Sequence, residues 1–111
     1  MTRLILFDPD LNHAECVKSS LRAATFEIAV CRDLAETLRA LGSAVFDILI
    51  LASCNAQECR HNIDLIQRMI GGKPSSPQII WLSPTYRGPE ERLEIERKGV
   101  RLVYERAHAT A

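Results

Sequence analysis

Two thiols and an imidazole lie within eight residues of one another, at Cys54, Cys59 and His61. Side chains of these types bind zinc, but a zinc site needs four protein ligands, or three and a water, usually with closer cysteine spacing. Only His13 and His108 could supply the remaining ligands, and the sequence places neither of them near this segment. We therefore expect no metal site here.

A redox switch between Cys54 and Cys59 is the alternative chemistry for this segment. It requires the two Cα atoms to come within about 7 Å, which a loop would allow. The favoured interpretation is that both are plain residues of a polar loop and the helix after it. Cys16 and Cys31 are interpreted as small core residues.

Asp8 and Ser83 each stand at the end of an apolar stretch, where the strands of a parallel sheet would bring them to one edge. Each is also explained without a function, because acids are common in turns and caps and a hydroxyl before Pro84 is ordinary in loops. The longest apolar run, Ile48 to Ala52, is typical of a strand buried on both faces. Its end, where chemistry is expected, carries Ala52, whose methyl group can do none.

The elements that must position these residues alternate along the chain. Apolar runs predict strands over residues 3–7, 26–31, 46–51, 78–83 and 100–104. Helical periodicity predicts helices over residues 11–24, 34–41, 58–70 and 90–98. Asp10 or Asn12 would cap the first helix and Asp33 the second, while Gly42 and Gly99 would end the second and the fourth. This alternation predicts an α/β sheet with right-handed crossovers.

Composition excludes several classes of protein. The chain of 111 residues is long enough for one domain with its own core, and its 14 basic residues balance 14 acidic ones. A net charge near zero provides no electrostatic reason to bind nucleic acid or anionic lipid, and it leaves self-association unopposed. The sequence has no apolar run of membrane-spanning length and no signal peptide, so we expect a cytoplasmic protein with reduced thiols.

Four segments, in order and spacing, resemble the receiver domain of bacterial two-component response regulators. Residues Leu4 to Asp8 resemble its first strand, which ends in an acidic pair, and Phe46 to Ala52 its third, which ends in the phosphorylated Asp. Residues Ile79 to Ser83 resemble the fourth strand, with its Ser/Thr switch, and Gly99 to Arg106 the last strand with its Lys. The resemblance spans residues 3–106 and implies a three-layer, flavodoxin-like fold with a five-stranded parallel sheet of order 2-1-3-4-5. It makes residues 1–106 the domain and 107–111 a short tail.

Carried over residue by residue, the family's phosphorylation site is largely dismantled. In the family, two acids and the acceptor Asp hold Mg²⁺, the acceptor takes the phosphoryl group, and the Lys neutralises it. The positions here are Asp8 for the first acid, Pro9 for the second, Ala52 for the acceptor, Ser83 for the switch hydroxyl and Arg106 for the Lys. Asp10 would need a shifted backbone to serve. The resemblance therefore implies an atypical, or pseudo-, receiver without enzyme activity or tight Mg²⁺ binding.

Receivers normally end with a fifth helix beside the first, but only seven residues follow Tyr104. Either the natural chain continues past Ala111 or this helix is missing. A missing helix would expose an apolar face, which we expect to bind a second copy or a partner's helix. The resemblance implies a protein partner such as a histidine kinase, an output domain or another regulator.

The family's aromatic position falls on Val103, so Tyr104 should face the other side of its strand. Trp81 is expected in the core. The alternative function is a small-molecule or redox sensor that uses the crevice beside Asp8 and the Cys54–Cys59 loop.

Overall fold

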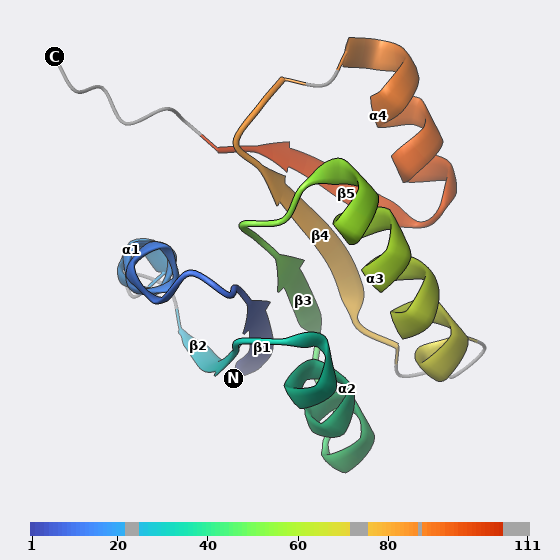
Figure 1. The fold of residues 1–111 in the computed structure, drawn as a ribbon. Helices are drawn as coiled ribbons and strands as arrows, with labels where there is room; N and C mark the ends of the chain where they lie inside the picture. Colours follow the sequence, from blue (N-terminus) through green and yellow to red (C-terminus); the bar gives the residue numbers. More distant parts are fainter. Residues whose placement is uncertain (22–24, 72–75, 87, 106–111) are drawn as a thin grey trace, which may run out of the picture.

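The computed structural model describes residues 1–21, 25–71, 76–86 and 88–105. Five strands alternate with four helices in this part of the chain, as Figure 1 shows. In chain order they are β1 (Thr2–Phe7), α1 (Leu11–Leu21), β2 (Phe26–Cys31), α2 (Leu34–Ser43), β3 (Ile48–Leu51), α3 (Ala56–Ile70), β4 (Gln78–Ser83), α4 (Gly88–Arg97) and β5 (Val100–Tyr104). No helix among these residues is long and apolar enough to cross a membrane.

All five strands are parallel and lie in the order β2-β1-β3-β4-β5, which confirms the predicted topology. The first and third strands are therefore neighbours, with Phe7 opposite Leu51. Parallel neighbours end at the same edge, so the residues that follow β1 and β3 come together. The chain has the α/β, flavodoxin-like fold expected from its sequence.

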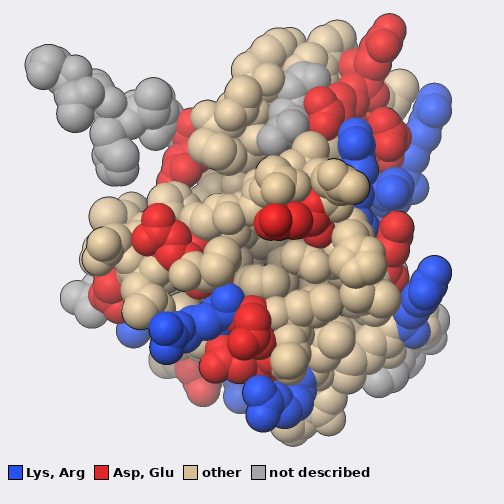
Figure 2. All heavy atoms as spheres, in the orientation of Figure 1, with Lys and Arg blue, Asp and Glu red and all other residues tan. Residues whose placement is uncertain are grey.

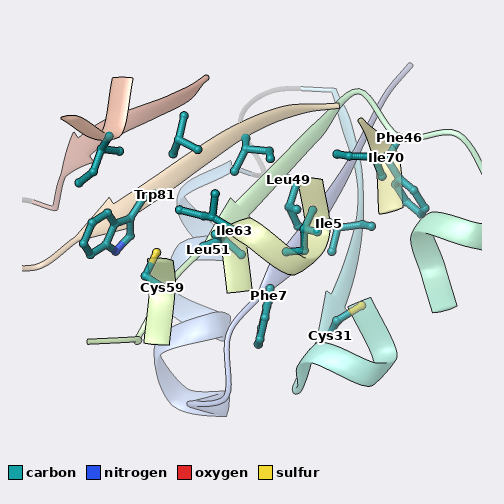
Figure 3. Close-up of a cluster of buried hydrophobic side chains, with 14 of the residues drawn as sticks. Ile5, Phe7, Cys31, Phe46, Leu49, Leu51, Cys59, Ile63, Ile70 and Trp81 are labelled. Carbon is teal, nitrogen blue, oxygen red and sulfur yellow. The ribbon is translucent and has the colours of Figure 1, made fainter. Parts of the chain in front are cut away.

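The sheet is covered unequally on its two faces. Helices α2, α3 and α4 pack on one face around a large core that includes Trp81, Ile63 and Cys59 (Figure 3). Trp81 is fully buried there, as predicted. Among the described residues, only α1 packs on the other face, over a smaller core around Leu6 and Ala14. The predicted core position of Cys16 is wrong: it is exposed on α1, because Ala14 and Val17 are the residues that this helix turns toward the sheet.

The structure corrects one predicted helix end and explains the other. Helix α2 continues through Gly42 to Ser43, so Gly42 does not end it. A methyl group on Gly42 would lie 3.1 Å from Met69 Cε, so this glycine lets α2 and α3 approach closely. Gly99, by contrast, has a φ of 83° just after α4, a conformation that favours glycine. Its predicted role as a helix end is confirmed.

Capping decides where two other helices begin. Asp10, rather than Asn12, caps α1, because its Oδ1 atom accepts the amide N–H groups of Asn12 and His13. Helix α3 begins at Ala56, two residues before the predicted start, since Asn55 accepts the Glu58 amide at 2.8 Å. The predicted start of β3 at residue 46 is also too early, because the strand begins at Ile48.

Candidate functional site

The carboxyl ends of the central strands form the crevice that the resemblance implies. Asp8 follows β1, Ala52 follows β3 and Ser83 ends β4, and all three are buried, with exposed fractions of 0%, 2% and 0%. The Ala52 amide donates to Phe7 O at 2.9 Å, which fixes the ends of β1 and β3 side by side. The structure thus brings Asp8, Ala52 and Ser83 to the ends of neighbouring strands, and Pro9 lines a small pocket beside Ala52.

The two remaining predicted positions contribute little that can be described. Pro9 is exposed and uncharged, and it stands where the receiver family has its second acid. Arg106 lies outside the described residues, as does the predicted tail 107–111. Asp10 uses its carboxylate to cap α1 and not to line the crevice.

The carboxylate of Asp8 is engaged within the protein through both oxygens. Oδ1 accepts the amide N–H of Asp10 at 2.9 Å, and Oδ2 lies 2.5 Å from Nδ1 of His13. A fully buried carboxylate is costly unless it is hydrogen-bonded and paired with a cation. His13 supplies that partner from the first turn of α1.

His13 also bonds to a second carboxylate, from the other end of the chain. Its Nε2 atom pairs with Oε1 of Glu105, the residue that follows β5, while the Glu105 amide donates to Ser83 O at 2.8 Å. Ser53, in the turn after β3, places its Oγ 3.2 Å from His13 Nδ1. One imidazole therefore joins groups that follow β1, β3 and β5.

The surroundings of His13 favour its charged form. Burial lowers its pKa, but the hydrogen bonds to Asp8 and Glu105, helped by their negative charges, outweigh burial and raise the pKa above its ordinary value of 6.5. A protonated imidazole has two N–H donors, one for each carboxylate. A neutral imidazole has one donor and could satisfy only one of them.

This arrangement differs from a nucleophilic triad. Ser53 has a left-handed backbone, with a φ of 54°, which is the kind of strain found at some active sites. A nucleophilic serine and the orienting acid must approach opposite nitrogens of the histidine. Ser53 and Asp8 instead approach the same nitrogen, Nδ1, and an imidazolium cannot accept a proton from Ser53.

Nor do these residues converge on a metal ion. Asp8 and Glu105 lie on opposite nitrogens of His13, so the ring separates the two carboxylates. Within the described part of the chain, no group of three His, Cys, Asp or Glu side chains is arranged to hold a metal ion.

Ser83 is engaged in its own loop. Its Oγ donates to Thr85 O at 2.8 Å and lies 3.4 Å from the Thr85 amide nitrogen. These bonds shape the turn before α4, which is the structural interpretation that the sequence favoured.

The cysteine segment is organised as a helix start. Asn55 is the cap and Glu58 is the third helical residue, a spacing typical of a capping box. Cys54 and Cys59 then occupy the two positions of a hydrophobic staple, and Cys54 packs against the core that contains the buried Cys59. The geometry therefore accounts for both thiols through packing and does not favour a redox switch.

An apolar groove lies on the α1 face, where the sequence predicted an uncovered patch. We name it the α1–β5 groove; its volume is about 360 Å³, and its apolar lining comes from Val17, Leu21, Ile50, Ile80, Leu82 and Val103. Glu105 lies at the end of this groove and also bonds to His13. The groove and the crevice thus share one residue.

Tyr104 points away from Val103, as predicted from the one-residue shift. Val103 faces the groove, whereas Tyr104 stacks on Tyr86, with ring centroids 5.3 Å apart, and lies under the Arg92 guanidinium at 5.6 Å. The aromatic residue at the end of β5 is therefore held against α4.

Sequence reasoning missed His13 and Glu105 as site residues. His13 was considered only as a zinc ligand, and Glu105 was not considered. Asp8 and His13 are close in the sequence and flank the start of a helix, which is a weak local signal. Nothing local connects either residue to Glu105, which lies 92 positions from His13.

Comparisons with known proteins agree on the fold. Two solved structures of the chemotaxis response regulator CheY4 of Vibrio cholerae align with this chain. The one crystallised at low pH has a TM-score of 0.73 over 95% of this chain and 85% of that chain, and the other has 0.70 over 94% and 84%. This chain has the fold of a chemotaxis response regulator. Sequence identity is 19% in both cases, so the likeness establishes the fold alone. No protein-family model matches the sequence, and no curated protein does.

Proposed function

We propose that this protein is a receiver-like signalling module that is not phosphorylated and acts through protein–protein interaction, in a two-component or related regulatory pathway. The observation that carries the proposal is Ala52, buried at the end of β3 where the receiver fold has its acceptor carboxylate. A methyl group cannot form an aspartyl phosphate. The module is accordingly not an enzyme.

The same crevice is a poor site for Mg²⁺, which prefers carboxylate oxygens in near-octahedral geometry. One carboxylate remains, on Asp8, and both of its oxygens already have partners. The residues present therefore do not fit the ion, and we expect no tight Mg²⁺ binding.

Intact-mass measurement after incubation with a small phosphodonor and Mg²⁺ tests this proposal. The expected result is an unchanged mass, beside a receiver with its acceptor Asp that gains one phosphoryl group under the same conditions. A stable phosphate adduct on an Asp of this chain would refute the proposal.

The surface that we assign to the interaction is the α1–β5 groove. Its lining is almost wholly apolar and includes Val103, which is 38% exposed. Exposed apolar grooves of this kind commonly receive one face of an amphipathic helix. We commit to a helix of a partner protein as the occupant.

Charge along β5 supports a helix in one direction, because Glu105 lines the groove and Arg101 lies on the same strand, two residues before Val103. Along β5, Arg101 and Val103 share a face with Glu105, because side chains alternate along a strand. A helix that runs antiparallel to β5 would place its positive N-terminal end near Glu105 and its negative C-terminal end near Arg101. A second copy of the chain fits the groove less well, because two concave grooves cannot fill each other. Outside the groove, the exposed large apolar residues of the described chain are scattered, at Met1, Leu11, Val45, Tyr86 and Leu93.

Helical peptides selected for binding to this chain provide the test. We expect them to shift the NMR signals of Val17, Ile80 and Val103, and the free chain to be monomeric by size exclusion with light scattering. Dimerisation that buries the same residues would show that a second copy of the chain, and not a partner's helix, occupies the groove. Selected helices that bind elsewhere would contradict the assignment.

Nucleic acid is not an expected partner. The 14 basic and 14 acidic residues balance, and Figure 2 shows the two kinds interspersed on the face that it presents, without a continuous basic surface. Binding to a nucleic-acid backbone depends on concentrated positive charge. No observation favours the small-molecule or redox sensor over the interaction module.

A further inference from the structure

The crevice contains one imidazole held between two carboxylates. His13 is the bridging group between two carboxylates, with Asp8 at 2.5 Å from Nδ1 and Glu105 on Nε2. Asp8 is fully buried, and the side chains of His13 and Glu105 are 21% and 27% exposed. Within the described chain, the other acid against His13 is Asp10, which accepts its backbone N–H. Ser53 adds a neutral hydroxyl.

We propose that His13 serves as an internal cation that takes the place of a metal ion in this crevice and ties the end of β5 permanently to the end of β1. A metal ion would have to displace His13 from Asp8, and it would find no second free carboxylate there. Both carboxylates instead receive an N–H donor from the same ring. The inference rests on the proposed function in one respect. The tie, by which we mean the contact of His13 with Asp8 and Glu105, would keep the groove in a single conformation without phosphorylation.

The contact between His13 and Glu105 is connected to the groove by the consecutive residues Val103, Tyr104 and Glu105. Glu105 is bonded by its side chain to His13 and by its amide to Ser83 O. Val103, two residues earlier, lines the α1–β5 groove, and Tyr104 between them stacks on Tyr86. Loss of the Glu105–His13 bond would therefore loosen the end of β5 and one wall of the groove.

Hydrogen exchange and NMR of the isolated chain test the tie without any partner. We expect both ring nitrogens of His13 to carry protons at neutral pH, and millimolar Mg²⁺ to leave these signals unchanged. In His13→Gln and in Glu105→Gln, the backbone amide of residue 105 should exchange about fivefold faster than in the wild type, because a charge-assisted bond is lost. The second variant keeps the shape of Glu105 at a partly exposed position, so it tests the tie even if His13→Gln folds poorly.

His61→Gln is the matched control, because His61 is exposed on α3, and it should leave Glu105 exchange at the wild-type rate. A singly protonated His13 at neutral pH, or unchanged Glu105 exchange in both test variants, would overturn the inference. Displacement of His13 from Asp8 by Mg²⁺ would overturn it as well. Each readout concerns the tie alone, so failure to find a helical partner, or discovery of a phosphate adduct, remains a separate result about the proposed function.

Discussion

The Oδ2 atom of Asp8 lies 2.5 Å from the Nδ1 atom of His13, inside the crevice between β1 and β3. This contact links a buried acid at a strand end to the first turn of the next helix. Through Glu105 on the other side of the ring, it also links the beginning of the chain to the end of the sheet.

Stability should fall as pH rises through the pKa of His13. That pKa is raised in the folded state, so the folded chain binds more protons than the unfolded chain above pH 6.5. The stabilisation is fully present below the unfolded value and is lost as pH passes the folded value. Urea denaturation at a series of pH values measures this. In His13→Gln the loss should disappear, and a wild-type stability that rises over this range relative to the variant would contradict the prediction.

Ala52→Asp alone should not restore phosphorylation. The new carboxylate would face Asp8 in a buried position, while Pro9 still lacks the second acid. We expect a loss of about 2 kcal/mol or more in the free energy of unfolding, because His13 already pairs with Asp8 and Glu105 and the added buried charge has no further cation. Ala52→Asn, with the same shape and no charge, should lose less. A phosphate adduct on Ala52→Asp in the intact-mass assay would mean that the pocket is less dismantled than its geometry implies.

Val103→Asp should weaken binding in the groove and leave the fold intact. A charge at a partly exposed position costs less than about 1 kcal/mol of stability. The same charge in the apolar centre of an interface should weaken a selected helix by about tenfold or more. Titration calorimetry measures the affinity. Leu93→Asp is the control, because Leu93 is 50% exposed on α4, outside the groove, and equal losses from both variants would argue against the groove.

Two glycines that look alike in the sequence should respond differently to alanine. Gly99→Ala should destabilise the protein by about 1–2 kcal/mol, because its φ of 83° is unfavourable for a residue with a Cβ. Gly42→Ala should change stability by less than about 0.5 kcal/mol, since better helix propensity offsets the contact with Met69 Cε at 3.1 Å. Thermal and urea unfolding compare the pair. A larger loss at Gly42 than at Gly99 would show that close packing of α2 and α3 matters more than backbone conformation.

The sequence by itself determined the alternation of strands and helices and the buried central strand that ends at Ala52, because apolar periodicity and residue identity are local. The strand order was predicted from the resemblance to receiver domains, and the structure confirms it. The sequence did not determine whether Gly42 ends a helix, because a glycine in a helix and a glycine after one have the same side chain. Only the packing against Met69 distinguishes them.

Tertiary structure alone decided what occupies the crevice. His13 and Glu105 stand 92 positions apart, and neither has a sequence neighbour that indicates the other. They meet because parallel strands deliver their carboxyl ends to one edge of the sheet, where the first turn of α1 also begins. The charge pairing in this crevice is thus a consequence of the fold, whereas the alanine at position 52 can be read directly from the sequence.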